Sequence, residues 1–224
     1  MLPYYADEWV TLYHGDCRDI PEWLDADFLC TDPPFGRDWK QGNLKDARRK
    51  PDSRDGIKGD KTTHMRDWAL GMWGMDKRAA VFGDLMLAPP DGTKQVLIYE
   101  KPMDGGRRAA TGGFRRDAEA VYLMGGWNYT LAGRTSILRT RVGMLSGASG
   151  YAAASGHPHA KPLDVMMELI RAADGCTLVA DPFAGSGSTL LAARRLGLKS
   201  IGVEVDEQYA NRAATRLSEP EMIQ

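Results

Sequence analysis

The stretch that decides the fold is CTLVADPFAGSGSTLLAARRLGLKSIGVEVDEQYANRAATRL, residues 176–217. An apolar run (176–181) leads into a glycine-rich turn (182–188) and a helix-like segment (189–197). A second apolar run (200–205) precedes another amphipathic segment (206–217), for which Asp206 is the expected N-cap. Strand–helix–strand–helix spacing predicts an α/β fold with a Rossmann-like, doubly wound and mostly parallel sheet.

The same reasoning extends toward the N-terminus. KPLDVMMELIRAADG (161–175) predicts a helix with Pro162 in its first turn, Gly175 at its end, and an apolar face made of Leu163, Met166, Met167 and Ile170. Strands are expected within 9–16, 26–31, 95–101 and 118–125, a short helix within 18–26, and a longer Met- and Trp-rich helix over 67–88.

Two segments lack this regular pattern. Residues 36–66 carry ten Lys and Arg against five Asp and Glu with few apolar residues, which predicts a long basic mobile loop or insert. Residues 134–156 are rich in Arg, Ser and Gly and are expected to form a small DNA-contacting region at most. We therefore expect one domain over residues 1–224.

Composition narrows the class of protein. The chain has 224 residues, of which 43% are hydrophobic, so a packed core is expected. The net charge of −1 means that any affinity for nucleic acid must come from local basic patches. Three scattered cysteines, Cys17, Cys30 and Cys176, argue against disulfides and cysteine-rich zinc sites. No apolar run approaches the length of a membrane span, so a cytoplasmic location and no membrane partner are expected.

The glycine-rich turn between the first strand and helix is suited to a ligand. Glycines let the backbone approach a bound group, although a tight turn alone would explain Gly185 and Gly187 equally well. No lysine follows Gly187, which disfavours a phosphate-binding P-loop, and the third glycine of a dinucleotide fingerprint is missing. A nucleoside without phosphates is the remaining candidate, because Glu204 ends the next strand, where a carboxylate can accept both ribose hydroxyls.

A second unusual turn, DPPF (32–35), ends the strand expected at 26–31. Two prolines can neither continue a helix nor donate to a sheet, so the turn is rigid. Taken alone, Asp32 could simply cap a strand end while Phe35 fills the core.

Together the two turns resemble the amino-directed DNA methyltransferases of the permuted beta class, which carry [DNS]PP[YFW] before a DPFxGSGT-like turn. GDC (15–17), HPHAKP (157–162) and GVEVDEQYANRAATRL (202–217) also resemble segments of that family. The likeness covers residues 9–35 and 157–217 closely and 67–130 by pattern. The turn reads GST instead of GTT, His159-Ala160 replaces Thr-Gln, and no compact target-recognition domain is apparent.

The resemblance implies a class I S-adenosylmethionine-dependent methyltransferase fold with a circularly permuted motif order. It implies S-adenosyl-L-methionine as cofactor and no metal, since two histidines at 157 and 159 without a third ligand do not make a metal site. The catalytic residues would be Asp32, Pro33, Pro34 and Phe35. The cofactor-binding residues would be Asp16, Cys17, Asp32, Lys161, Asp181, Phe183, Ala184, Gly185, Ser186, Gly187, Ser188, Glu204 and Val205.

The expected reaction is methyl transfer to the exocyclic amino group of a flipped base in DNA. The Asp32 carboxylate and the Pro33 carbonyl would accept from the amino N–H bonds, and Phe35 would stack on the base. Asp at the first position of DPPF favours adenine N6 over cytosine N4 by family usage. Basic segments 36–66 and 101–116 would contact phosphates, and Trp39 would cover the base.

Other classes of function predict different behaviour. A non-catalytic Rossmann-like module would bind nucleic acid or cofactor without methyl transfer, and a nicotinamide-dependent oxidoreductase would bind a dinucleotide. The recognition sequence, a duplex or single-stranded substrate, a monomeric or homodimeric state, and a role beside a restriction enzyme or in a phage are all left open by the sequence.

Overall fold

The computed structural model describes residues 1–35, 62–101, 111–127, 133–140 and 160–219. Several predictions therefore concern residues outside the described ranges: residues 36–61 with Trp39, 102–110, 141–156, His157 and His159.

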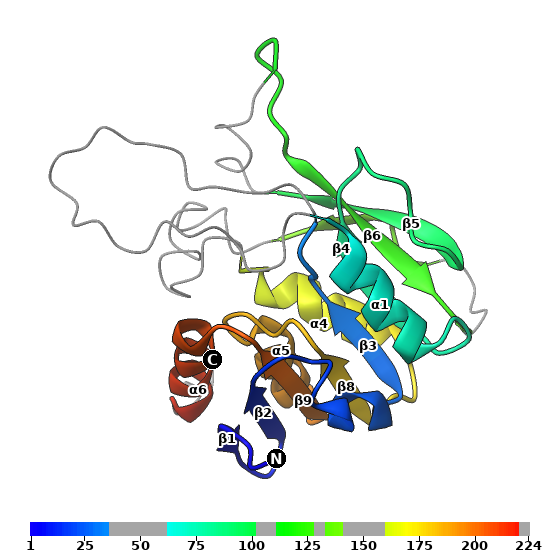
Figure 1. Cartoon of the computed structure of the whole chain (residues 1–224). Helices are drawn as coiled ribbons and strands as arrows, with labels where there is room; N and C mark the ends of the chain where they lie inside the picture. Colours follow the sequence, from blue (N-terminus) through cyan, green and yellow to red (C-terminus); the bar gives the residue numbers. More distant parts are fainter. Residues whose placement is uncertain (36–61, 102–110, 128–132, 141–159, 220–224) are drawn as a thin grey trace, which may run out of the picture.

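The described residues form one nine-stranded sheet in the order β1-β2-β9-β8-β3-β4-β6-β5-β7 (Figure 1). Its five central strands are β2 (Val10–His14), β9 (Lys199–Glu204), β8 (Leu178–Asp181), β3 (Phe28–Thr31) and β4 (Ala79–Gly83), and each neighbouring pair among them is parallel. β6 (Ala118–Met124) is antiparallel to both β4 and β5 (Thr93–Glu100), while β7 (Ile137–Arg139) runs parallel to β5. β1 (Tyr5–Ala6) pairs antiparallel with β2. The expected doubly wound, mostly parallel sheet is confirmed.

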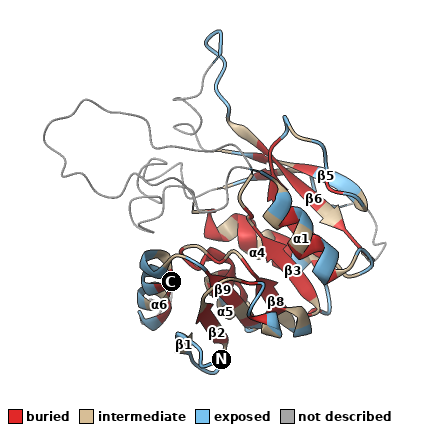
Figure 2. Cartoon of the chain, in the orientation of Figure 1, coloured by how far each residue is buried: buried red, intermediate tan, exposed pale blue. Residues whose placement is uncertain are grey.

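Helices cover both faces of the sheet because side chains of β3, β4 and β8 alternate between two apolar clusters. α4 (Leu163–Ala172) and α5 (Ser188–Arg195) pack on the face that carries Phe28 and Cys30. α1 (His64–Trp73) and the short 3₁₀ helix η1 (Pro21–Asp25) pack on the face that carries Leu29. α6 (Glu207–Ser218) contributes Ala213 and Leu217 to a third cluster beside β2. Figure 2 shows that the buried residues concentrate in the central strands and in the inner sides of these helices.

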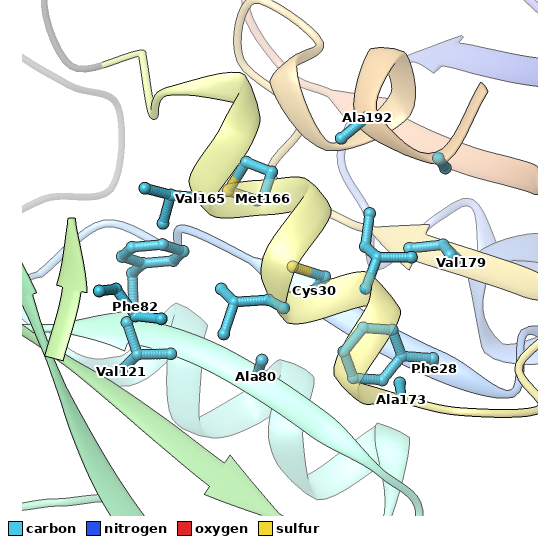
Figure 3. Packing of buried hydrophobic residues seen from close by; sticks show 14 of the residues in the cluster. Phe28, Cys30, Ala80, Phe82, Val121, Val165, Met166, Ala173, Val179 and Ala192 are labelled. Atoms are coloured by element: carbon cyan, nitrogen blue, oxygen red, sulfur yellow. The ribbon is translucent and has the colours of Figure 1, made fainter. Parts of the chain in front are cut away.

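The largest cluster lies between α4 and the middle of the sheet (Figure 3). Met166 of α4 lies over Cys30, while Phe28, Val179 and Ala173 close the cluster toward the end of α4. Because residues of α4, β3 and β8 are almost fully buried there, the strand that carries DPPF is packed rigidly against the strand that carries the glycine-rich turn.

The two motif-bearing strands meet at the point where the strand order reverses. From β8 the chain proceeds through α5 to β9 on one side, whereas from β3 it proceeds to β4 on the other. In open α/β sheets, ligands bind outside the carboxyl ends of strands at such a switch point. Both the DPPF turn and the turn after Asp181 follow these carboxyl ends.

The helix expected over 67–88 is wrong in its second half. α1 begins earlier, at His64, inside the segment predicted as a loop, and it ends at Trp73. Residues Ala79–Gly83 instead form β4, which is buried at all five positions. A short, uniformly apolar run cannot be assigned to helix or strand by periodicity, and its place between β3 and β6 decides the outcome.

The last third of the chain follows the sequence prediction closely. Asp206 is the N-cap of α6, and its side chain accepts a hydrogen bond from Gln208 N. The buried face of α4 contains Val165 and Leu169 in addition to three of the predicted residues, whereas Met167 is only partly buried. In the segment 134–156, the described part contains β7, which was not predicted.

None of the helices in the described ranges combines the length and the apolar character that a membrane crossing requires.

Gly202 in β9 generates a prediction about stability. A Cβ atom at this position would lie 2.6 Å from Leu190 Cδ1 and 3.1 Å from Ala184 Cβ, both in buried side chains. Gly202→Ala should lower the free energy of unfolding by about 1–3 kcal/mol through overpacking. Gly71 on the exposed side of α1 has nothing within 4 Å, so Gly71→Ala should stabilise by about 0.5–1 kcal/mol. Chemical denaturation of both variants measures this difference, and equal effects would contradict the packing described.

Candidate active site

A buried carboxylate joins the two motif-bearing strands. Thr31 at the end of β3 donates its hydroxyl to Asp181 Oδ1 of β8 at 2.6 Å, and Thr189 of α5 donates to Oδ2 at 2.5 Å. Phe183 N also donates to Oδ1, at 3.1 Å. Burial raises the pKa of Asp181 to about 7, although these hydrogen bonds oppose the shift. Asp181 therefore joins β3, β8 and α5, because its carboxylate oxygens accept hydrogen bonds from Thr31, Thr189 and Phe183.

Asp32 directly follows Thr31 and makes an ion pair. Lys161 Nζ lies 2.5 Å from Asp32 Oδ2. The other oxygen, Oδ1, is buried and has no hydrogen-bond partner among the residues that the structure describes. Burial raises the pKa of Asp32 to about 6 against the opposing effect of the Lys161 charge, and Glu119 adds to the increase. This oxygen is therefore available to accept a hydrogen bond from a ligand.

Sequence reasoning missed the rest of this charged group. Glu119 of β6 lies 3.2 Å from Lys161 Nζ, and Lys101 lies 2.6 Å from the other Glu119 oxygen. Glu119 stands in an apolar run whose alternation was interpreted only as a strand, and its charge within that run was the available signal. Lys161, expected to approach a cofactor, contacts the predicted catalytic carboxylate in the protein without ligands.

Aromatic rings line the same corner. The Lys161 ammonium lies 4.9 Å from the centroid of the Phe82 ring and 5.5 Å from that of Phe35. Pro33 is buried, while Pro34 and Phe35 are partly buried. Phe35 packs against the edge of the main core cluster without being enclosed by it, so part of its ring remains accessible.

The glycine-rich turn has the backbone conformation that its sequence predicts. Gly185 and Gly187 both have positive φ, 51° and 79°, and Gly187 is the N-cap of α5 in the left-handed region. Ser186 is held from outside, since Arg216 of α6 donates to its carbonyl and, at 3.1 Å, to its hydroxyl oxygen. Phe183 is partly buried, and Ala184 and Ser188 are buried. The turn is thus fixed by both neighbouring helices.

Glu204 closes the turn from the next strand. Its carboxylate accepts from Gly185 N at 2.7 Å and from Asp206 N at 2.8 Å. Burial raises the pKa of Glu204, and these backbone donors oppose that increase. Each carboxylate oxygen has two lone pairs, so both can accept one further hydrogen bond from a ligand hydroxyl. Val205, directly after it, is 41% exposed and supplies an apolar surface.

Asp16 and Cys17 lie on the adjacent strand end. His14 of β2 is in register with Glu204, and Gly15 N donates to the Glu204 carbonyl at 2.9 Å. Asp16 is held by Arg18, whose side-chain nitrogens lie 3.0 and 2.7 Å from its two oxygens, and this pairing lowers the pKa of Asp16. The Cys17 side chain is buried in the second core cluster, and burial raises the pKa of its thiol to about 12.

These residues share one edge of the sheet. β9, β8 and β3 are consecutive neighbours, so the backbones at Glu204 and Asp32 are about 10 Å apart, two inter-strand spacings. Asp181 lies between them, and Asp16 lies one strand beyond Glu204. One bound molecule the size of a nucleoside with a short side chain spans that distance.

The chemistry of the edge fits an uncharged nucleoside better than a phosphate. The Gly185 amide, which a phosphate would need, already donates to a carboxylate, and that carboxylate would repel an anion. The Glu204 carboxylate fits the hydroxyls of a ribose, and the exposed Val205 beside it fits a flat heterocycle. Within the described ranges there is no group of three or more His, Cys, Asp or Glu residues that could hold a metal ion.

Comparisons with known proteins agree with this geometry. The family model described as DNA methylase (N6_N4_Mtase) matches residues 46–215, about three quarters of the chain. The DPPF turn lies before the matched range. Type II methyltransferase M.HindIII of Haemophilus influenzae is 33% identical over 136 residues, which are 54% of this chain and 39% of that enzyme. Among the curated relatives found, the aligned segments cover between 21% and 39% of their lengths.

Solved structures share the fold. The M1.HpyAVI–SAM complex superimposes with a TM-score of 0.62 at 20% identity and covers 94% of this chain and 100% of that chain. PvuII DNA methyltransferase, described as cytosine-N4-specific, has a TM-score of 0.63 at 18% identity and covers 99% and 90%, respectively. Because the family model matches about three quarters of the chain, the chain belongs to the N6/N4 DNA methylase family.

Proposed function

We propose that the protein is a DNA methyltransferase that transfers a methyl group from S-adenosyl-L-methionine to the exocyclic amino group of a flipped base. Adenine N6 is the preferred acceptor, because Asp occupies the first position of the DPPF turn. Cytosine N4 is the alternative, and the fold similarity to the PvuII enzyme keeps it open.

One observation carries the proposal. Asp32 presents one carboxylate oxygen, Oδ1, that is buried and has no partner within the described part of the chain, while Lys161 holds the other oxygen. An unpaired buried acceptor is costly, so it persists where a ligand supplies the donor. An amino group on a base is such a donor.

Residues at the neighbouring strand ends would hold the cofactor. Glu204 would accept from the ribose hydroxyls, the turn Phe183–Ser188 would lie against the methionine portion, and Asp16 and Val205 would line the adenine side. The chemistry that bound S-adenosyl-L-methionine supplies is an electrophilic methyl group on a sulfonium sulfur. Asp181 would act on this site only indirectly, by fixing β3 against β8.

The chain's own residues would prepare the acceptor nitrogen. The lone pair of an exocyclic amino group is delocalised into the ring, so the nitrogen is a poor nucleophile. Asp32 Oδ1 and the Pro33 carbonyl would accept from its two N–H bonds and localise that lone pair, and the prolines keep both acceptors in place. After transfer, Asp32 can take the proton that the nitrogen releases. Phe35 would stack on the extruded base.

Contacts with DNA are proposed for the segment between β5 and β6. Its described part, residues 111–117, leads directly into the amino end of β6 and projects from the sheet there (Figure 1). Phe114 is 83% exposed and is followed by the exposed Arg115 and Arg116. Lys101, also predicted to contact phosphates, pairs with Glu119. Aromatic and cationic side chains together suit a nucleic-acid backbone and its bases.

Asp32 provides the first test. Asp32→Ala should lower methyl transfer at least about 100-fold, because alanine offers no acceptor to the amino N–H bond, and should leave cofactor affinity within a few fold. Mass spectrometry of nucleosides after incubation with DNA should detect 6-methyladenine in the wild type. Asp91→Asn, an exposed substitution, is the matched control. Finding 4-methylcytosine alone would overturn the adenine assignment, and cofactor binding without any methylated base would favour the non-catalytic binding module.

Glu204 provides the second test. Glu204→Gln should weaken binding of S-adenosyl-L-methionine about 10-fold or more, since one charged acceptor for a ribose hydroxyl is lost. Isothermal titration calorimetry measures the affinity, and Glu207→Gln, an exposed change at the start of α6, is the control. Equal affinities for both variants would show that the ribose lies elsewhere.

The pH dependence follows from Asp32, whose pKa burial raises to about 6. The ionised carboxylate is the active acceptor, so kcat/KM should be constant above this pKa and fall tenfold per pH unit below it, through one protonation. Measuring kcat/KM from pH 5 to 8 records this fall at acid pH. Activity that persists unchanged at pH 5 would exclude Asp32 as the titrating acceptor.

A further inference from the structure

Four charged side chains form a continuous row that ends at the proposed acceptor. Lys101 pairs with Glu119 at 2.6 Å, Glu119 lies 3.2 Å from Lys161, and Lys161 lies 2.5 Å from Asp32. The charges alternate along the row, so it is neutral as a whole. The side chains at its two ends, Lys101 and Asp32, are partly exposed, at 27% and 24%.

The row is unusual because its two middle members are buried. The side chains of Lys161 and Glu119 are 7% and 11% exposed. Removing a lysine from water is costly unless opposite charges surround it, and here both neighbours are carboxylates. Burial alone would lower the pKa of Lys161, but Asp32 and Glu119 reverse that effect and raise it. Burial alone would likewise raise the pKa of Glu119, but Lys161 and Lys101 lower it.

The three partners come from different elements of the sheet. Glu119 is on β6, Lys101 directly follows β5, and Lys161 lies two residues before α4. The Lys101 amide also donates to Asp117 O at 2.7 Å, which ties the ends of β5 and β6 together. The antiparallel side of the sheet is thereby connected to the parallel strand that carries Asp32. Lys161 is thus contacted both by Asp32, which follows β3, and by Glu119 of β6.

We propose that Glu119, held by Lys101, is a positioning residue that fixes the Lys161 ammonium against Oδ2 of Asp32, so that Oδ1 alone faces the amino group of the target base. The catalytic role of Asp32 in this inference rests on the proposed function. The row itself does not, because it is a property of the protein without ligands.

The geometry explains why two carboxylates are needed around one lysine. If Lys161 had Asp32 as its only anionic partner, the ammonium could donate to either Asp32 oxygen and occupy the acceptor that a base needs. The second contact to Glu119 limits its movement toward Oδ1. The Phe82 ring at 4.9 Å supports the ammonium from another direction.

The charged groups around Asp32 also shift its pKa, some upward and some downward. Lys161 and Lys101 favour its ionised form, whereas Glu119 disfavours it, and Asp181 of β8 and the Cys30 thiol of β3 are further titratable groups that interact with it. Loss of the Glu119 charge should therefore lower the pKa of Asp32, and loss of the Lys161 charge should raise it. If Glu119 and Lys161 only supported the fold, their loss would not shift the Asp32 pKa in opposite directions.

The experiment measures the Asp32 carboxyl directly. Protein labelled with ¹³C at aspartate is titrated by NMR, with Asp32 assigned from the Asp32→Asn spectrum. Glu119→Gln should lower the Asp32 pKa by on the order of one unit, and Lys161→Met should raise it by a similar amount. Glu100→Gln is the matched control, because Glu100 on the adjacent β5 makes an exposed pair with Arg139 at 2.8 Å. That variant should leave the Asp32 pKa unchanged.

Kinetics then test the positioning role. Glu119→Gln should lower kcat for methyl transfer about 10-fold while leaving the KM for S-adenosyl-L-methionine within about twofold, because the acceptor geometry and not cofactor binding is disturbed. The acid limb of the pH profile of this variant should move to lower pH together with the Asp32 pKa measured by NMR. An unchanged Asp32 pKa together with unchanged kcat in Glu119→Gln would overturn the inference.

Two further results keep the test decisive. If Glu119→Gln does not fold, Lys101→Gln at the partly exposed end of the row should still raise the Asp32 pKa, and an unchanged value would contradict the row. If the wild type transfers no methyl group but the paired pKa shifts occur, the proposed function fails while the charged row stands. If the wild type is active and no shifts occur, the further inference fails alone.

Discussion

The hydrogen bond from Thr31 to the buried Asp181 carboxylate is the interaction on which the site depends. It joins residues that are 150 positions apart in the sequence, and a second hydroxyl, from Thr189, ties the same carboxylate to α5. Because the donors come from β3 and α5, one side chain fixes the DPPF turn relative to the glycine-rich turn. A buried carboxyl is costly without such donors, so a substitution here would disturb both halves of the site together.

The parallel centre of the sheet makes this junction possible. β8 and β3 are neighbours, and their chain connections leave in opposite directions, so their carboxyl ends border an open edge. On one side of the junction lie the acids Glu204 and Asp16, with the exposed Val205 directly after Glu204. On the other side Asp32 lies against a buried lysine. The proposed division of the edge into a ribose-binding part and an amino-activating part therefore follows from the strand order and from the few polar residues at strand ends.

The sequence predicted the last third of the chain, because strand, turn and helix signals there are local and consistent, and the family resemblance predicted that the two motifs meet. It failed at Ala79–Gly83, where a uniformly apolar run has no distinguishing period, and at the start of α1, which lies within a polar segment. The pairing of Lys161 with Asp32 could not be predicted, since it joins residues 129 positions apart and depends on how α4 packs. Glu119 was missed for the same reason: its partners belong to other elements.

The central claim is that one ligand bridges the two motifs at this edge, and a crystal structure of the protein with S-adenosylhomocysteine tests it most directly. The account predicts that the ribose hydroxyls contact the Glu204 carboxylate and that the sulfur lies on the side of the junction occupied by Asp32. A ligand bound away from Glu204, or with its sulfur directed away from Asp32, would contradict it.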